Sequence, residues 1–222
     1  MAGFYRNRGR SVIAVAHPAA TRWSTGGPTR ARVDGNGAIL RLMTDALQTD
    51  PAPAARDRDG VPAPFDRYRD IVRPEWIDHN RHMNMGYYLL VFDLATDEWL
   101  RDVGLDQAHR EAHGVTTFCL EAHITYHREV REGDPLRFTT RLLGWDAKRI
   151  HYFHEMHHAT LGYLAATNEL MTLHVSQETR RASPMAPAIR ERLARIQTAH
   201  AHLPRPAQVG RRIGLDAPPS TR

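Results

Sequence analysis

Hydrophobic and polar positions divide the chain into a long unpatterned stretch and a patterned region that begins near Phe65. Residues 1–65 are rich in Arg, Pro, Gly and Ala, and only residues 38–47 suggest a short helix. They lack the sustained periodicity that packed elements show. We therefore expect residues 1–65 to be a disordered or transit-peptide-like extension.

Residues 85–103 carry the strongest helical pattern. Apolar side chains cover most of the circumference of this segment, charges gather toward its end, and Gly104 supplies a C-terminal stop. A helix that is apolar on most sides is buried on most sides. The pattern therefore predicts a central helix with other elements wrapped around it.

Alternating apolar positions predict strands on both sides of this helix. One strand precedes it, at residues 68–72, and four follow, at residues 115–127, 136–145, 148–158 and 162–175. Turn-forming residues separate the later strands, which favours antiparallel pairing. The expected class is α+β, with an antiparallel sheet wrapped around the central helix over residues 66–182.

The end of the chain predicts one more helix. Residues 187–203 are amphipathic through Ile189, Leu193 and Ile196, so a C-terminal helix is expected within residues 183–203, docked outside the sheet. A Pro- and Arg-rich tail follows at residues 204–222.

The charge of +5 is concentrated at the start of the chain. Residues 1–42 hold seven arginines and one acid, so the rest of the chain is close to neutral. A nucleic-acid surface would need a basic patch on the folded part, so nucleic acid is not an expected partner. No apolar run reaches the roughly 18 residues that a membrane span needs, so a membrane is not expected either.

The only cysteine is Cys119, which excludes an internal disulfide and favours a reducing compartment, the cytoplasm. It lies between Phe118 and Leu120 in a strand pattern. We expect it to be a small buried hydrophobic residue rather than a nucleophile.

A short polar turn places Asp78 just before the apolar helix. The first amides of a helix have no partner within it, so they can polarise a carbonyl group, while a carboxylate can act as base or nucleophile. Capping the turn or the helix is an equally good role for Asp78 on spacing alone. Asn84 is a candidate N-cap, and His82 is as well suited to a structural hydrogen bond as to a substrate contact.

This region resembles a known family. The order of one strand, Asp78-x-Asn80-x-His82-Met-Asn84, a helix and four strands is similar to the hot-dog fold of the 4-hydroxybenzoyl-CoA thioesterase-like family. Short matches look like betainyl-CoA thioesterases, which act in carnitine breakdown; they are Pro74–Asn80, Glu121–Ile124, Lys148–His151 and Gly210–Ile213. The resemblance implies an acyl-CoA substrate and a homodimer or homotetramer, and it implies no cofactor.

The resemblance also implies roles for individual residues. Asp78 matches the catalytic aspartate of the family, and His82 and Asn84 match its Gly-His-x-Asn-Asn motif. Two positions depart from the motif: Arg81 stands where glycine is usual, and Met85 replaces the second asparagine. Arg81 puts a cation near the expected site, where it would bind an anionic part of the substrate or alter the site.

Other candidates concern the substrate. Glu121 interrupts an apolar strand pattern, so it is either a second acid that faces the site across a subunit boundary or an outward-facing surface residue. Asn80 lies at the mouth of the expected site. Phosphates of coenzyme A favour arginine and lysine, and aromatic faces favour a trimethylammonium group. The candidates of these two kinds are Arg128, Lys148 and Arg149, and Trp76, Tyr87, Tyr88 and Trp99.

His154–His158 contains the HExxH pattern of zinc proteases. That motif needs a helix, but the preceding residues predict a strand, on which the two histidines lie about 13 Å apart at ~3.3 Å per residue. No metal site is therefore expected. The leading hypothesis is an acyl-CoA thioester hydrolase. The alternatives are a non-catalytic acyl-CoA-binding or dehydratase-like hot-dog protein and, less well supported, a metal hydrolase.

Overall fold

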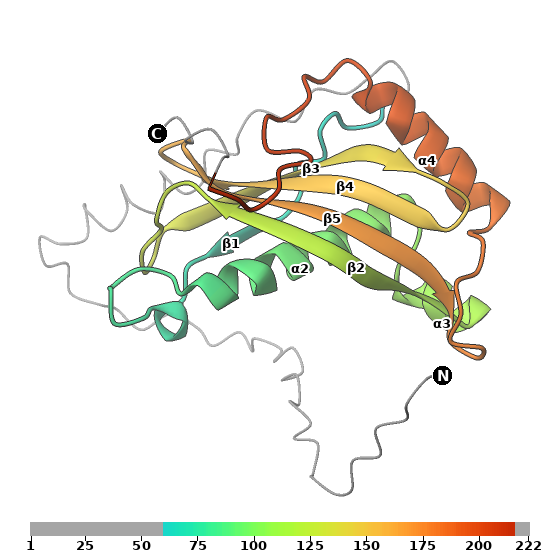
Figure 1. The fold of residues 1–222 in the computed structure, drawn as a ribbon, viewed down its shortest axis with the longest axis horizontal. Helices are drawn as coiled ribbons and strands as arrows, with labels where there is room; N and C mark the ends of the chain where they lie inside the picture. Colours follow the sequence, from blue (N-terminus) through green and yellow to red (C-terminus); the bar gives the residue numbers. More distant parts are fainter. Residues whose placement is uncertain (1–59, 216–222) are drawn as a thin grey trace, which may run out of the picture. The chain divides into compact units, whose positions relative to one another are not determined.

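A computed structural model describes residues 60–215. It shows an antiparallel sheet curled around one helix (Figure 1). The strands are β1 (Arg69–Ile71), β2 (Val115–Tyr126), β3 (Pro135–Trp145), β4 (Arg149–His158) and β5 (Leu164–Ser176). The helices are η1 (Pro74–Trp76), α2 (Met85–Val103), α3 (Gln107–His113) and α4 (Pro187–His200). The α+β class and the hot-dog arrangement are confirmed.

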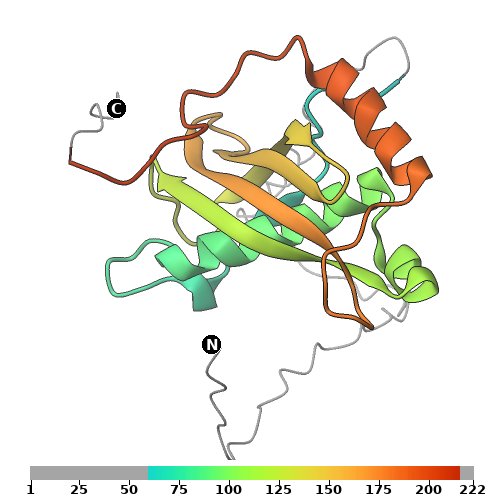
Figure 2. The same ribbon diagram turned by 45° about the vertical axis from the view of Figure 1, so that its right-hand side comes forward.

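The strand order is β1-β3-β4-β5-β2, and every pair is antiparallel. The sheet therefore has two edges of unequal length. At one edge β1 has only three residues, whereas at the other β2 has twelve. Figure 2 shows β2 and β5 passing across α2. A long unpaired edge strand presents a row of free backbone groups, so β2 is the edge that can accept another strand.

The central helix α2 has the bounds that the sequence predicts. Asn84 adopts an extended conformation before it, and its Oδ1 accepts a hydrogen bond from Gly86 N–H at 2.9 Å. Gly104 ends the helix in the left-handed conformation, with φ of 91°, which costs glycine little. The buried face of α2 includes Tyr88, Phe92 and Trp99, so its apolar pattern reflects packing under the sheet.

Two groups of buried side chains fill the space between α2 and the sheet. One surrounds the first half of α2 and includes Trp76, Phe92 and Phe138. The other surrounds its second half and joins Trp99 and Tyr152 to side chains of α4, including Leu193. The helix α4 therefore closes one end of the domain.

Two elements were not expected from the sequence. Helix α3 spans only seven residues and has no buried side chain, so it lacks the apolar stripe from which helices are predicted. Asp106 caps its start through a hydrogen bond from His109 N–H at 2.8 Å. The other element, η1, is a single turn that begins at Pro74.

Most of the expected extension, with its short helix at residues 38–47, lies outside the described residues. At its end, Phe65 pairs with Thr140 as an isolated bridge and packs edge-on against Trp99, with ring centroids 5.0 Å apart. The expected domain limits otherwise remain predictions. Within residues 60–215, no helix combines the length and apolarity that a membrane crossing requires.

The expectation that Cys119 is buried is wrong, because its side chain is exposed. Cys119 lies on the edge strand β2, directly opposite Thr172 of β5, and its inner side borders an open cleft rather than packed core. The flanking apolar residues Phe118 and Leu120 are also exposed. An apolar sequence on an edge strand thus does not imply burial within one chain.

Candidate active site

The Asp78 loop is a tight hairpin that leads into α2. Ile77 and Met83 form a bridge, and Asp78 N–H donates to the His82 carbonyl at 3.1 Å. Arg81 N–H donates in turn to the Asp78 carbonyl at 3.0 Å. These bonds hold Asp78 one short loop away from the first turn of the helix.

The side chain of Asp78 is mostly buried, with 16% exposed. Its Oδ1 accepts a hydrogen bond from Asn80 N–H at 2.8 Å, which is the turn-capping role considered above. His82 Nδ1 lies 3.9 Å from the same oxygen, beyond hydrogen-bond distance. The structure therefore brings Asp78, Asn80 and His82 together and leaves the second carboxylate oxygen of Asp78 without a hydrogen bond from the described residues.

Arg81 has φ of 64°, so its backbone is in the left-handed region. Non-glycine residues reach that region at a cost of roughly 1–2 kcal/mol. The loop thus retains the conformation for which glycine is suited, although arginine occupies the position. The side chain of Arg81 is exposed and has no ion pair among residues 60–215, so its cation is available to a ligand.

The N-terminus of α2 offers fewer free donors than the sequence suggests. Gly86 N–H is bound to Asn84 Oδ1, and Tyr87 N–H donates to the Asn84 carbonyl at 3.0 Å. Met85 N–H has no partner in the described part of the chain. Asn84 is therefore the cap of the helix, and Met85 N–H is the amide left to meet an oxyanion.

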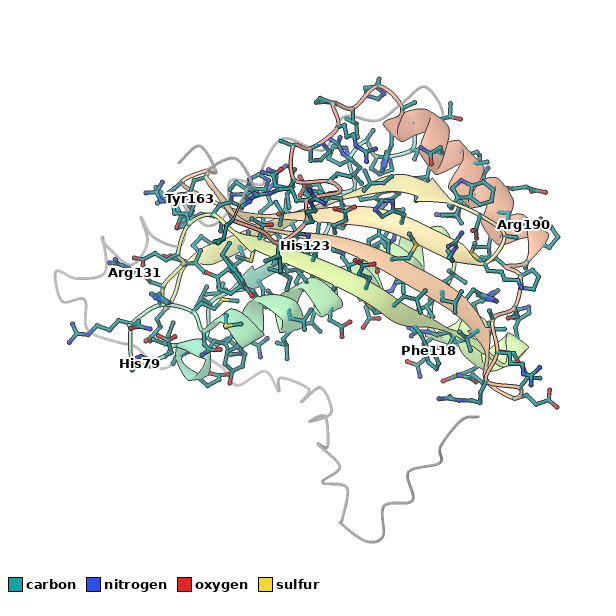
Figure 3. All side chains as sticks on the ribbon, viewed as in Figure 1. His79, Phe118, His123, Arg131, Tyr163 and Arg190 are labelled. Atoms are coloured by element: carbon teal, nitrogen blue, oxygen red, sulfur yellow. The ribbon has the colours of Figure 1, made fainter. Side chains whose placement is uncertain are left out.

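A second strand–loop segment supports this site from the side. Met83 N–H donates to the Val130 carbonyl at 2.9 Å, which ties the hairpin to the loop after β2. In that loop Arg128 lies over the ring of Tyr163, with 4.0 Å from Cζ to the centroid. Arg131 pairs with Glu129 at 2.6 Å and holds the pKa of Glu129 below its usual value. Figure 3 shows Arg131 and His79 at the same end of the molecule.

The aromatic candidates are largely engaged with one another. Trp76 is buried, with Tyr87 stacked on it at 5.8 Å and the Arg73 guanidinium 4.8 Å from its centroid. Tyr88 is buried edge-on to Tyr126, and Trp99 is core. These aromatic side chains pack against one another in the folded chain. The sequence alone does not show whether an aromatic residue packs in this way or contacts a ligand.

Lys148 and Arg149 lie far from Asp78 within one chain. Lys148 lies in the turn between β3 and β4 and Arg149 begins β4, where it pairs with Asp146 at 2.6 Å. The Asp78 hairpin lies near the other end of β3, where Val72 N–H donates to Asp134 O. Eleven residues of extended strand separate the two ends, or roughly 35 Å.

Glu121 faces away from α2. It is exposed and lies opposite Met171, whereas Leu170 and Thr172 on either side of Met171 border the cleft beside α2. Because successive residues of a strand alternate between faces, Glu121 shares the outer face with Met171. A register shift between Cys119 and Glu121 turns Glu121 to this outer face. The sequence does not reveal the shift. The structure therefore does not bring Glu121 to Asp78 within one chain.

The HExxH segment is the strand β4, as expected. His154 is fully buried and bonded through its ring nitrogens to Thr96 and Thr140, at 3.0 and 2.8 Å. His158 lies at the end of the strand, 3.5 Å from Asp134. The two histidines therefore have different neighbours and lie in different parts of the strand.

An open cleft of about 700 Å³ starts beside the first turn of α2 and runs along the helix under β2. Its walls include Gly86, Leu90, Asp93, Cys119, Tyr152 and Asn168. Asp93 and Asn168 are not among the site residues that the sequence predicts. In the sequence, Asp93 stands out only as a charge in a mostly apolar helix, and Asn168 only as a polar residue in a mostly apolar strand.

Known proteins are similar to this chain in sequence and in fold. The sequence model of the thioesterase-like superfamily matches residues 72–193. A betainyl-CoA thioesterase from Pseudomonas aeruginosa is 41% identical over 148 residues, which are 67% of this chain and 93% of the relative. An L-carnitine dehydrogenase/betainyl-CoA thioesterase from Rhizobium meliloti is 36% identical over 143 residues, and the match spans only 29% of that longer protein.

Two solved structures are similar as well. A Staphylococcus aureus protein in complex with CoA superposes with a TM-score of 0.65 and 31% identity, over 68% of this chain and 95% of that one. A proposed thioesterase from Pseudomonas putida gives a TM-score of 0.61 and 34% identity, over 71% and 100% of the two chains. These matches agree with the curled sheet and its central helix. The chain therefore belongs to the thioesterase-like superfamily.

Proposed function

We propose that the protein hydrolyses acyl-CoA thioesters, with betainyl-CoA as the favoured substrate. The observation that carries this proposal is the Asp78 hairpin, which leads into the N-terminus of α2, where Gly86 borders the cleft and Met85 N–H has no partner among residues 60–215. The name of the Pseudomonas aeruginosa relative supports the choice of acyl group, and the CoA complex of the Staphylococcus aureus protein supports the choice of thiol.

In the proposed reaction, water adds to the thioester carbonyl and the carbon–sulfur bond breaks. The products are a carboxylate, the free thiol of coenzyme A and a proton. Asp78 either removes the proton from water or attacks the carbonyl itself to give an anhydride that water then cleaves. Met85 N–H and the positive end of the α2 dipole stabilise the developing oxyanion.

The remaining site residues have supporting roles in this proposal. Asn84 holds the first turn of α2, and His82 and Asn80 shape the surroundings of Asp78. Arg81 and Arg128 bind phosphates of coenzyme A. Trp76 and Tyr87 back the hairpin, while Lys148, Arg149 and Glu121 would contribute only from a second subunit.

We further propose a homodimer, or a homotetramer built from two such dimers, with the cytoplasm as its location. Support comes from β2, whose outer edge pairs with no other strand in the described part of the chain, and from exposed apolar side chains beside it. These are Met85, Leu89 and Leu90 on α2 and Phe118, Leu120 and Tyr126 on β2. Pairing two copies through β2 would cover this surface and satisfy the edge.

The test of the hydrolase proposal is the release of free thiol from betainyl-CoA, acetyl-CoA and benzoyl-CoA. We expect wild type to release thiol and Asp78→Asn to lower kcat/KM on the order of 10²–10⁴-fold. Glu75→Gln, an exposed acid in η1, is the matched control. Equal rates for wild type and Asp78→Asn would remove Asp78 from the mechanism.

The departures at Arg81 and Met85 support a second candidate, a binding protein without catalysis. In that case CoA thioesters would bind to wild type, as measured by calorimetry, but no thiol would be released from any of the three. Thiol release by wild type would exclude this candidate.

A further inference from the structure

Asp93 is a carboxylate on the apolar side of α2, and no residue from 60 to 215 gives it a cationic partner. Leu89 and Leu90, which precede it by four and three residues, are exposed on the same side of the helix. No ion pair or hydrogen bond reaches Asp93 from residues 60–215. By contrast Asp97, one turn later, lies 3.7 Å from Arg110.

The surroundings of Asp93 disfavour its charge. Burial raises its pKa, and repulsion by Asp97 raises it further. If a second chain covers the apolar side of α2, as proposed above, the carboxylate loses more water. Arg110 lines the same cleft, but it lies against Asp97 rather than Asp93. A buried charge requires a partner, so a ligand that supplies a positive charge would stabilise it.

An independent feature lies on the sheet side of the same cleft. Asn168 of β5 is fully buried and lines the cleft, yet neither its amide oxygen nor its amide nitrogen has a hydrogen-bond partner among the described residues. Buried amides are almost always satisfied, so two unsatisfied atoms on one cleft wall indicate a polar occupant. Tyr152 adds a buried aromatic ring to this wall.

The length of the cleft relates these groups to the site of hydrolysis. The cleft extends from Gly86, at the N-terminus of α2, to Asp93 and beyond. Seven residues of helix rise about 10 Å at 1.5 Å per residue, and helical side chains lean toward the N-terminus. A carbonyl held at the first turn therefore places its acyl group at the start of this cleft, with Asp93 further along the same wall.

We propose that Asp93 determines specificity for a cationic acyl group by binding its quaternary ammonium end inside this cleft. This inference rests on the proposed thioesterase function and adds the residue that selects the substrate. A quaternary ammonium supplies the positive charge that Asp93 lacks, and its polarised methyl groups can contact the amide oxygen of Asn168. The carboxylate supplies the attraction, and the ring of Tyr152 offers an aromatic surface.

The test compares two thioesters of the same shape. Betainyl-CoA carries a trimethylammonium group, whereas 3,3-dimethylbutyryl-CoA carries a neutral tert-butyl group in its place. We expect wild type to favour betainyl-CoA in kcat/KM by about tenfold or more. Asp93→Asn should lower kcat/KM for betainyl-CoA about tenfold, mainly through KM, and change that for the neutral thioester by less than about twofold.

Glu98→Gln is the matched control, because it removes one negative charge from the same helix and Glu98 pairs with Arg101 away from the cleft. It should retain the wild-type preference. Equal kcat/KM of wild type for the two thioesters would overturn the role of Asp93 while leaving the hydrolase proposal intact. An equal loss on both thioesters in Asp93→Asn would also overturn it. If wild type released thiol from no acyl-CoA, the hydrolase proposal itself would fail.

Discussion

His154 Nε2 lies 3.0 Å from Thr96 Oγ1, and this contact joins the middle of β4 to the middle of α2 inside the core. The Thr96 hydroxyl donates its hydrogen to the Phe92 carbonyl at 2.9 Å, so toward His154 it accepts. His154 therefore carries its proton on Nε2, and Nδ1 accepts from the Thr140 hydroxyl at 2.8 Å. A neutral ring satisfies both bonds.

The first prediction concerns this buried histidine. Burial lowers the pKa of His154 to about 3, against about 6.5 in the unfolded chain. Between these values the unfolded state binds a proton that the folded state does not, so stability is lost as the pH falls below 6.5. From pH 7 to pH 5, His154 should lower the free energy of unfolding by about 2 kcal/mol.

Urea unfolding at the two pH values measures this loss. His154→Gln, which can donate and accept but does not titrate, should be less stable than wild type at pH 7 and should show a smaller loss at pH 5. The matched control is His79→Gln in the exposed hairpin. If wild type and His154→Gln lost equal stability, the histidine would not be the source of the pH dependence.

The cap of α2 gives the second prediction. Asn84 Oδ1 satisfies Gly86 N–H, so Asn84→Ala should lower the free energy of unfolding by about 1 kcal/mol. Asn84→Asp keeps an oxygen at the same place and should recover most of that stability. Thermal or urea unfolding of the three proteins measures the effect, and an equal loss in both variants would argue against capping.

The third prediction concerns the left-handed residue of the hairpin. Glycine reaches φ of 64° without the steric cost that Arg81 bears, although it loses more conformational freedom on folding. We expect Arg81→Gly to raise the free energy of unfolding by about 0.5–1 kcal/mol, whereas Arg81→Ala leaves it near the wild-type value. If alanine stabilised as much as glycine, backbone conformation would not be the cause.

Arg81→Gly also separates stability from binding. Loss of the cation should raise KM for acyl-CoA substrates, because Arg81 is exposed beside Asp78 and has no ion pair in the described chain. Steady-state thiol release measures this change. Arg81→Lys keeps the charge and should keep most of the binding, so equal KM values for glycine and lysine variants would contradict a phosphate contact.

The fourth prediction tests the edge of the sheet. Leu120 is exposed on β2, in the apolar surface that a second copy would cover. We expect wild type to have about twice the 25.2 kDa mass of one chain, or four times that mass, by light scattering. Leu120→Asp should shift the population to single chains, because a charge would be buried in the interface.

Leu161→Asp is the control for that change, since Leu161 is equally apolar and exposed but lies in the turn between β4 and β5. It should assemble as wild type does. Assembly of Leu120→Asp at wild-type concentrations would place the interface elsewhere.

Local patterns predicted the elements of this fold well. The apolar periodicity of α2 gave its bounds as observed, and all five strands agree within two residues at each end. These features depend on residues close in sequence, and so they can be read from one chain. The hairpin at Asp78 and the cap at Asn84 were predictable for the same reason.

Properties that depend on distant residues were less accessible. The exposure of Cys119 follows from the position of β2 at the sheet edge, and the outward direction of Glu121 follows from a register shift. Asp93 and Asn168 line the same cleft only because α2 packs under β5. Strand order and register decide all of these, and neither is encoded in periodicity.

The closure of the domain by α4 has a consequence for its synthesis. His200 Nδ1 accepts the buried Leu142 N–H at 2.9 Å, beside the register shift in β3. His200 is therefore among the last helical residues to leave the ribosome, and it accepts a hydrogen bond from a strand residue synthesised 58 positions earlier. A nascent chain that ends before residue 200 leaves that amide without its acceptor, so the domain can complete its core only after translation has passed α4.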